Sequence, residues 1–446
     1  MVFSSLTFLL FFLPLVLLGH TALPRRFRNA FLLAASLVFY GAGDLGNLPL
    51  LAAMTLADWA AAKWMDRTEG NTRRAFLAAA VGLNAGVLIV FKYLKLIAPG
   101  LRAYPALPLG ISFFAFQSIS YLVDVYRREV EAERNLKDYA AYILLFPQLI
   151  AGPIVRYSKV RKELHDREVT AEHLEKGMML FLCGLALKTL LANPLGEMCE
   201  GLRAIPERGA AAGWMVLLSC AFQYYYDFFG YSLMALGMGR MMGFRFPDNF
   251  RHPFAAVSIQ DLWRRWHMTL GAFLRSYVYI PLGGSRKGKL RMIISLLVTW
   301  AVSGLWHGAG WNFLWWGLYF GVLIVMERCC WGGWLSRHPA AGRIYTLILF
   351  VFSWTLFIND TPGDILSFTG ELFRPRLGEN AAFLTMNGAL ALAGAVLLAF
   401  PRVWERMAGF VQRHPAAGRA GAVLLLAMCL LALTRAGYNP FLYFRF

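Results

Sequence analysis

The chain has 446 residues, of which 58% are hydrophobic and 16% are charged. Soluble globular proteins contain about 25% charged residues, so this composition excludes an ordinary soluble enzyme. The formal net charge is +18, but apolar runs separate the basic residues along the whole chain. We therefore expect this charge to face a membrane surface rather than a nucleic acid.

Apolar stretches recur from end to end, many of them close to the length of a helix that crosses a bilayer. They predict an all-α polytopic membrane protein with about twelve crossings. No stretch resembles a soluble domain, so we expect residues 1–446 to form a single membrane domain. The expected spans are 5–23, 29–40, 47–62, 75–91, 109–126, 174–192, 212–239, 290–306, 311–326, 344–358, 382–401 and 420–434.

The basic residues predict an orientation for these spans. Most Lys and Arg residues lie in alternate connections, among them 24–28, 127–137, 156–176 and the long segment 240–291. Cytoplasmic connections carry an excess of Lys and Arg, so these connections are predicted to be inside and both termini outside.

Two apolar stretches do not fit as crossings. Residues 139–153 have basic connections on both sides, which favours a re-entrant hairpin turning near Pro147 to Pro153. Residues 256–283 alternate arginines with aromatic residues, and we interpret them as an interfacial amphipathic helix or a cavity wall.

The six cysteines lie mostly inside apolar runs and show no zinc-ligand spacing. We expect them to be free thiols that pack as small hydrophobic residues, and we expect no metal site.

Asp227 interrupts the apolar stretch 212–239. A buried carboxylate needs a partner, and we expect His307 or an arginine of the basic segment to supply it. With such a partner Asp227 is a candidate substrate- or donor-binding residue, and a structural hydrogen-bond network between helices is the alternative interpretation.

His267 follows Arg264 and Arg265 in the segment DLWRRWHMTL. If this segment is helical, Arg264 and His267 share a face. The two arginines could bind the phosphates of an anionic donor, or they could simply contact lipid headgroups.

His307 lies in SGLWHGAGW at 303–311, between two apolar segments. Gly304, Gly308 and Gly310 allow close backbone approach, and Trp306 and Trp311 could form the walls of a small cavity and contact the substrate or donor there. Imidazole accepts and returns protons near neutral pH, so His307 is the candidate catalytic residue. The alternative is a histidine hydrogen-bonded at an outer turn.

Several long motifs together resemble the membrane-bound O-acyltransferase family, and within it the bacterial branch that includes the alginate O-acetyltransferase membrane subunits. The motifs are FPQLIAGPIVRY (146–157), YYDFFGYSLMALGMGRMMGFRFPDNFRHPF (225–254), LWRRWHMTLGAFLRSYVYIPLGGSRKG (262–288) and SGLWHGAGWNFLWWGLYFG (303–321). The resemblance implies a ring of about 11–12 transmembrane helices, with re-entrant and interfacial helices, around a thin core with a cytoplasmic funnel.

The resemblance also implies roles for individual residues. It makes His307 the catalytic histidine and His267 a second functional histidine. It further implies an acetyl donor in the cytoplasm, acetyl-coenzyme A, which is a substrate and not a bound cofactor. A periplasmic SGNH-type partner, a polysaccharide acceptor and a location in a bacterial cytoplasmic membrane are implied in the same way.

From the residues themselves we expect Arg264, Arg265 and the group Arg286 to Lys289 to attract the phosphates of the donor. Other acceptors remain open, namely peptidoglycan or, with D-alanine as the cargo, teichoic acid. A transporter or flippase with His307 in a proton relay is the hypothesis from a different class. Against it, the sequence shows no duplicated half.

Overall fold

A computed structural model describes residues 2–101, 103–150, 152–206, 208–375 and 386–435. Within these ranges the chain forms helices joined by turns and no β-strand, which confirms the all-α prediction. The described residues pack as two compact units. The first takes the chain up to Phe181 together with Ser232–Asp248, and the second takes Leu182–Tyr231 together with the described residues from Asn249 onward.

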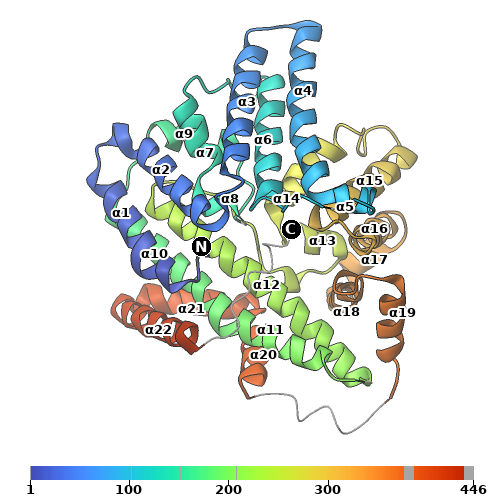
Figure 1. The fold of residues 1–446 in the computed structure, drawn as a ribbon. Helices are drawn as coiled ribbons and strands as arrows, with labels where there is room; N and C mark the ends of the chain where they lie inside the picture. Colours follow the sequence, from blue (N-terminus) through green and yellow to red (C-terminus); the bar gives the residue numbers. More distant parts are fainter. Residues whose placement is uncertain (1, 102, 151, 207, 376–385, 436–446) are drawn as a thin grey trace. The chain divides into compact units, whose positions relative to one another are not determined.

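The first unit is built from the N-terminal helices and the end of α12. Its elements are η1 (Phe8–Phe12), α1 (Leu13–Ala22), α2 (Arg25–Asp44), α3 (Leu48–Asp66), α4 (Gly70–Leu88), η2 (Ile89–Tyr93), α5 (Leu94–Ile97), α6 (Ile111–Tyr126), α7 (Leu136–Ile143), α8 (Phe146–Leu149), α9 (Tyr157–His165) and the start of α10 (Ala171–Ala186). Helices α3, α4 and α6 lie side by side in this unit (Figure 1).

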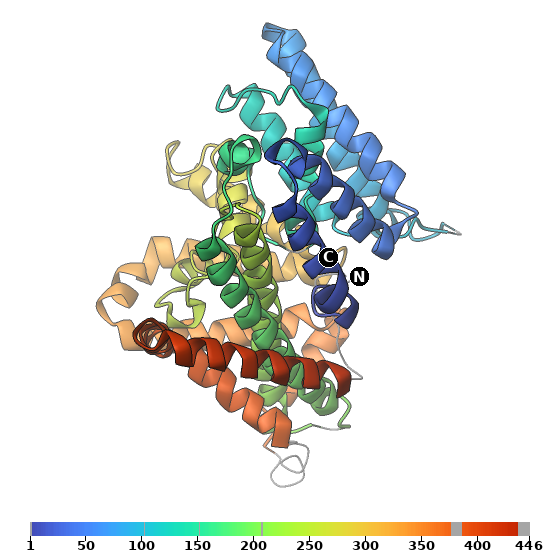
Figure 2. The same ribbon diagram turned by 90° about the vertical axis from the view of Figure 1, so that its left-hand side faces the viewer.

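A cluster of phenylalanines joins the N-terminal helices of this unit to α8. The Phe3 ring lies 5.6 Å from that of Phe39, and the Phe39 ring lies 5.5 Å from that of Phe146. Such ring pairs bury large apolar areas and favour tilted or edge-to-face geometry. They hold α1 and α2, which pack against each other (Figure 2), over the segment that contains Phe146.

The segment 139–153 is a broken, buried stretch of backbone, as its predicted hairpin requires. It comprises the end of α7 and the short helix α8, and its described residues are buried. Polar side chains bind the interrupted backbone: the Tyr142 hydroxyl donates to the Val155 carbonyl over 2.8 Å, and Gln148 Nε2 donates to the Tyr142 carbonyl over 2.5 Å. Non-helical backbone at membrane depth needs such internal partners.

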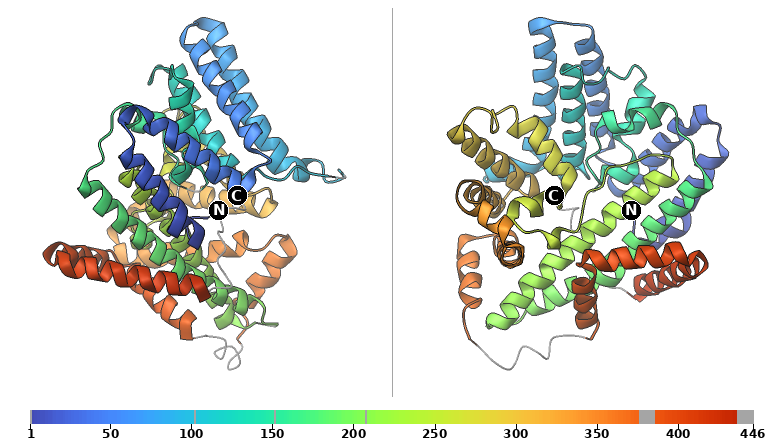
Figure 3. Two further views of the ribbon diagram at one scale, coloured as in Figure 1. Left: turned by 60° about the vertical axis from the view of Figure 1, so that its left-hand side comes forward. Right: turned by 180° about the vertical axis from the view of Figure 1, so that it is seen from behind.

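The second unit is built from the end of α10 and the C-terminal half of the chain. Its elements are η3 (Leu187–Ala192), α11 (Asn193–Arg203), most of α12 (Ala210–Met241), η4 (Pro253–Ala255), α13 (Ile259–Trp263), α14 (Met268–Leu274), η5 (Arg275–Tyr279), α15 (Lys289–His307), α16 (Trp311–Met326), η6 (Glu327–Trp331), α17 (Gly332–Arg337), α18 (Pro339–Phe357), α19 (Pro362–Glu371), α20 (Met386–Leu398), α21 (Pro401–Arg413) and α22 (Pro415–Arg435). Proline in the first turn marks the start of several of them, including α18 and α22. Helices α21 and α22 pack against each other (Figure 3).

The predicted spans coincide with helices wherever the structure describes them; residues 382–385 lie outside the described ranges. In the part of the chain that the structure describes, six helical stretches are long and apolar enough to cross a membrane. They are Gly70–Ile97, Ala171–Arg203, Lys289–His307, Trp311–Arg337, Pro339–Phe357 and Pro415–Arg435. The pair Gly388–Leu398 and Pro401–Arg413, bent by 85°, counts as a seventh if it is one span. The polytopic prediction is therefore confirmed, whereas the number twelve stays a prediction.

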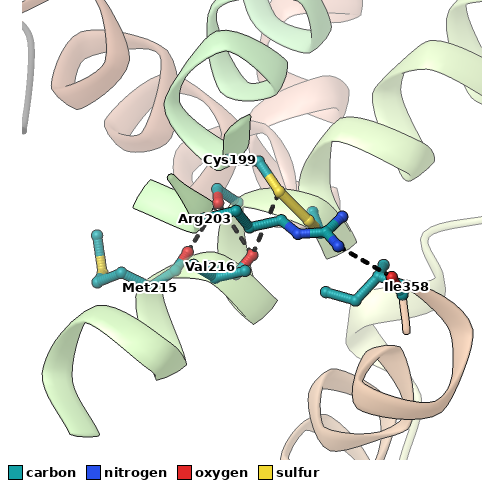
Figure 4. The surroundings of a disulfide bond; sticks show 7 residues. Cys199, Arg203, Met215, Val216 and Ile358 are labelled. Atoms are coloured by element: carbon teal, nitrogen blue, oxygen red, sulfur yellow. Dashed lines mark hydrogen bonds between the residues drawn. A yellow bond between two sulfur atoms is a disulfide. The ribbon is translucent and has the colours of Figure 1, made fainter. Parts of the chain in front are cut away.

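Two cysteines form a disulfide, which corrects the expectation that all six are free. Cys199 on α11 is bonded to Cys220 on α12, with 5.8 Å between their Cα atoms (Figure 4). Cys183, Cys329, Cys330 and Cys429 are free. The sequence could not predict the pair, because the two cysteines are 21 positions apart and the stretch between them includes the turn that brings α11 back against α12.

Removing this disulfide should lower the stability of the second unit. Cross-linking a loop of about 20 residues restricts the unfolded chain and contributes about 3 kcal/mol. We expect the double variant Cys199→Ser/Cys220→Ser to unfold at a lower temperature than the wild type in detergent. The matched control, Cys329→Ser/Cys330→Ser, should not. Equal unfolding temperatures for the wild type and both variants would contradict the prediction.

Candidate active site

Close packing of α15 against α16 positions His307. A methyl group at Gly304 would overlap the carbonyl oxygen of Phe313, and one at Gly317 would lie 2.9 Å from the Cα of Gly304. The two backbones can approach this closely only because both positions lack a side chain. The expected close approach at Gly304 is thus confirmed. His307 is the last residue of α15, just before the turn to α16.

His307 is buried at this turn, with 3% of its surface exposed. Three aromatic rings surround it, and we call Trp306, Trp316 and Phe357 the aromatic cage. Their centroids lie 5.0, 5.0 and 5.9 Å from that of His307. Asn312 Nδ2 donates to the Phe357 carbonyl over 3.4 Å, which ties the end of α18 to the start of α16. The imidazole therefore lies in an apolar, largely water-excluded setting.

The sequence identified only one of the three residues of the aromatic cage. Trp306 is buried, as expected, whereas Trp311 is 60% exposed and does not enclose His307 as we expected. Trp316 encloses His307 in its stead. It lies one helical turn after Asn312, on the same buried side of α16. Contact of Trp311 with a substrate stays a prediction. Phe357 carried no local sequence signal, since it comes from a helix 50 residues further along the chain.

His267 lies at a break between two short helices, which corrects the expected shared helical face with Arg264. Helix α13 ends at Trp263 and α14 begins at Met268, and His267 has a left-handed φ of 44°. This conformation is uncommon for a residue with a side chain. Asn249 stabilises this interruption between the two helices, because its backbone carbonyl oxygen accepts a hydrogen bond from the Met268 N–H over 2.9 Å.

The same asparagine sets the tautomer of His267. Asn249 Oδ1 accepts from the Thr269 hydroxyl over 2.9 Å and lies 3.0 Å from His267 Nδ1, so Nδ1 carries the proton and donates. Nε2 is left with a lone pair and has no hydrogen-bond partner among the described residues. Burial, and then the nearby His307, lower the pKa of His267 well below its usual value. His267 is therefore a neutral acceptor at pH 7.

The two histidines are linked through one ring of the aromatic cage. The Trp306 centroid lies 5.6 Å from that of His267 and 5.0 Å from that of His307. Phe228 of α12 packs edge-on to His267 from another side, at 4.7 Å. Two imidazoles from distant parts of the sequence thus share one apolar environment.

A cavity of about 190 Å³ reaches His267. Three exposed arginines line it, Arg264, Arg275 and Arg328, together with tryptophan and aliphatic side chains and the hydroxyl-bearing Thr299 and Ser303. The exposed arginines mark its solvent side and the buried His267 its closed end. Segment 256–283 is therefore a cavity wall, the second of its two predicted forms.

The two arginines that were predicted to act as a pair have different surroundings in the structure. Arg264 lines the cavity, whereas Arg265 Nε donates to Asp261 Oδ1 over 2.9 Å, which compensates its charge. The group Arg286 to Lys289 contributes none of the residues that line this cavity within the described chain. Arg275 and Arg328 were missed as donor-binding candidates; Arg328 follows α16 and comes close only through the fold.

A buried carboxylate fixes the cavity wall. Glu327, 4% exposed, accepts the Ile259 N–H over 2.6 Å and the Gln260 N–H over 2.9 Å. These are two of the free amides at the start of α13, where a negative charge is also favoured by the helix dipole. The side chain of Ser258 caps the same helix by accepting from the Asp261 N–H over 3.0 Å. Arg264, which directly follows this short, anchored helix, is thereby held in place.

Asp227 pairs with Lys188, which corrects the expected partners His307 and the basic segment. Their closest atoms, Lys188 Nζ and Asp227 Oδ1, are 2.7 Å apart, and the side chains are 3% and 1% exposed. Lys188 also donates to Asn193 Oδ1 over 2.8 Å. The missed signal was Lys188 itself, a cation deep inside the predicted span 174–192, far from Lys176 near the start of that span. The pair joins η3 to α12, next to Phe228.

The sequence matches a family model. The model of the membrane-bound O-acyltransferase family aligns with residues 32–359. This range includes His267, His307 and every residue that lines the cavity.

Three known proteins illustrate the range of similar chains. The chain is 34% identical to a probable alginate O-acetylase of Pseudomonas putida, and the alignment covers the whole of both proteins. It is 32% identical to a peptidoglycan O-acetyltransferase of Helicobacter pylori, over 89% of this chain and 81% of that protein. It is 27% identical to a teichoic acid D-alanyltransferase of Bacillus subtilis, over 49% of this chain and 58% of that protein.

Breaking the Lys188–Asp227 pair should destabilise the second unit strongly. Lys188→Met leaves a buried carboxylate without its cation, a change that costs ~3–5 kcal/mol in comparable pairs. The double variant Lys188→Met/Asp227→Asn removes both charges and should recover part of that loss. Thermal unfolding in detergent measures both effects. If the double variant were less stable than Lys188→Met alone, the pairing of these two charges would not be the cause.

Proposed function

We propose that this chain, which belongs to the membrane-bound O-acyltransferase family, passes acetyl groups from cytoplasmic acetyl-coenzyme A across the membrane for O-acetylation of an extracellular polysaccharide such as alginate. Family membership makes the chain a membrane O-acyltransferase. The proposal about the donor and the direction of transfer rests on one structural observation. A cavity lined by arginines ends at His267, and the Trp306 ring lies against both His267 and His307.

The cavity has the polarity that a coenzyme A thioester needs. Guanidinium groups bind phosphate oxygens through paired, charge-assisted hydrogen bonds, and Arg264, Arg275 and Arg328 offer three of them on the solvent side. The apolar walls suit the pantetheine arm, whose length separates the phosphates from the thioester. We assign the phosphates to the arginines and the thioester end to the side of His267 and Trp306.

His307 has the chemistry for the transfer in either of two ways. As a general base it takes the proton of the acceptor hydroxyl while that oxygen attacks the thioester carbonyl; the carbon–sulfur bond breaks, and the coenzyme thiolate leaves and takes up a proton. As a nucleophile it first becomes acetylated and then gives the acetyl group to the hydroxyl. In both cases Trp306 and the rest of the aromatic cage exclude water, which would otherwise hydrolyse the thioester.

The acceptor side of the proposal rests on the relatives. Probable alginate O-acetylases align with the chain at 34–37% identity, which favours a polysaccharide over the acceptor of the D-alanyltransferases. We place an SGNH-type protein outside the membrane as the partner that receives the acetyl group. We propose a bacterial cytoplasmic membrane as the location of the chain, which its multi-pass fold and its bacterial relatives support. The Cys199–Cys220 disulfide supports that orientation, because the connection after span 174–192 is predicted to face the oxidising side.

Removing the His307 imidazole should abolish transfer. In vesicles with radiolabelled acetyl-coenzyme A on the cytoplasmic side and a hydroxyl acceptor outside, we expect His307→Ala to lose at least ~100-fold in rate, the usual contribution of a positioned base. Label that stays on the wild-type protein without acceptor would identify the acyl-histidine route. If the wild type consumes no thioester with a competent acceptor present, the acetyl-coenzyme A proposal fails, and ion-driven uptake is the next assay.

Neutralising an arginine of the cavity should weaken donor binding. Arg264→Gln should raise the KM for acetyl-coenzyme A roughly tenfold, the value of one lost charge-assisted contact, with little change in kcat. Arg286→Gln, which makes the same charge change outside the cavity lining, is the matched control and should leave the KM unchanged. An unchanged KM for Arg264→Gln would contradict the assignment, and a rise for Arg286→Gln alone would move the phosphates to the 286–289 group.

A further inference from the structure

The first unit contains a basic cavity that the proposed acetyl transfer does not use. It has a volume of about 250 Å³ and lies between the start of α2, the start of α7 and the end of α9. We call it the α2 cavity. Its lining residues are mostly cationic: Arg25, Arg26, Arg28, Asn29, Lys137, Asp138, Leu164, His165 and Arg167.

The carboxylates near this cavity already have partners. Asp138 Oδ1 accepts from Asn29 Nδ2 over 2.8 Å and lies 3.6 Å from Lys137 Nζ. Glu133 Oε2 accepts from the Tyr157 hydroxyl over 2.5 Å and lies 3.0 Å from His165 Nε2. Neither carboxylate forms an ion pair with the arginines at the start of α2.

Arg25 and Arg167 are held by the protein itself. Arg25 Nη2 lies 2.8 Å from Glu168 Oε1, with Asp166 at 3.4 Å from Nη1. Arg167 is buried, and its Nη1 donates to Asn29 Oδ1 over 2.6 Å. Arg167 is thus the buried, fixed cation of the cavity, whereas Arg25 is exposed and paired with two carboxylates.

Arg26 and Arg28 have no carboxylate within ion-pair distance among the described residues. Both lie in the first turn of α2, which contains no acidic residue. The positive end of a helix dipole disfavours cations and favours an anion, so this placement is unfavourable unless something negative binds. Burial, and then the nearby Arg28, lower the pKa of Arg167 to about 10, and Asp138 acts in the opposite direction.

The surroundings of the cavity are those of a membrane surface. The turn between α1 and α2 joins two apolar helices, and the predicted orientation places it inside, where the leaflet is anionic. Leu15 and Leu18 of α1 are 66% and 67% exposed, and Phe27, beside Arg26, is 47% exposed. Apolar side chains in such positions contact acyl chains while arginines nearby contact headgroups.

We propose that the α2 cavity binds the phosphate group of an anionic ligand through Arg26 and Arg28, with Arg167 beneath them. A phosphate offers several oxygens to two guanidinium forks and to the free amides at the helix start. An anionic phospholipid headgroup and free phosphate share this chemistry. The site is independent of the acetyl transfer, because its residues belong to the first unit and none lines the cavity at His267.

The test is native mass spectrometry of the full chain in detergent with phosphatidylglycerol or phosphatidylcholine, each with and without inorganic phosphate. We expect phosphatidylglycerol to bind the wild type at least tenfold more tightly than it binds Arg26→Gln/Arg28→Gln. The matched control is Arg67→Gln/Arg74→Gln, two exposed arginines that also lie in a basic connection and do not line the cavity. It should bind like the wild type. The single variant Arg26→Gln, at an exposed position, covers the case in which the double variant fails to fold.

Each outcome decides the proposal. Loss of phosphatidylglycerol in the α2 variants alone, insensitive to inorganic phosphate, supports the site with lipid as the source. Competition by millimolar inorganic phosphate, lost in the same variants, supports the site with free phosphate as the source. Equal binding of phosphatidylglycerol to the wild type and both α2 variants overturns it. Equal binding of phosphatidylcholine and phosphatidylglycerol to the wild type overturns it as well.

Discussion

The contact between α15 and α16 is the constraint on which the candidate active site depends. Gly304 and Gly317 let the two backbones touch, and this contact fixes where α15 ends and therefore where His307 lies. The aromatic cage then closes around the imidazole from α15, α16 and α18. A larger residue at either glycine would separate the helices and open the cage, although neither glycine touches His307. The position of the candidate catalytic histidine thus follows from the packing of two helices.

The sequence predicted the parts of this site that are local in the chain. His307, its neighbouring glycines and Trp306 all lie within residues 304–310, so their association needs no knowledge of the fold. Phe357, Asn249 and Arg328 could not be found in that way, because long-range packing brings them to the two histidines. The all-α polytopic fold was predictable for the same kind of reason, since apolar stretches report on the bilayer locally, whereas the pairing of Cys199 with Cys220 depends on how α11 turns back on α12.

Two errors came from treating apolar or helical patterns as continuous. The segment DLWRRWHMTL has the composition of an amphipathic helix. The helix is nevertheless interrupted at His267, where the Met268 N–H donates to the backbone carbonyl of Asn249 and not to a carbonyl of the preceding helical turn. Lys188 was overlooked because its neighbours are apolar, although a lone cation in a span must find an anion there. In both cases a polar side chain from a distant segment decided the local structure. When a membrane topology is predicted, polar residues inside apolar stretches should therefore first be considered as possible partners of one another.

The left-handed backbone at His267 affects how this residue can be studied. Most side chains are strained at a φ near +44°, and asparagine is among the few that tolerate it. An alanine substitution would therefore change both the imidazole and the backbone energy, and lost activity could not be ascribed to either. His267→Asn keeps the backbone acceptable and removes the ring, so it separates the chemical role of the imidazole from its role in the fold.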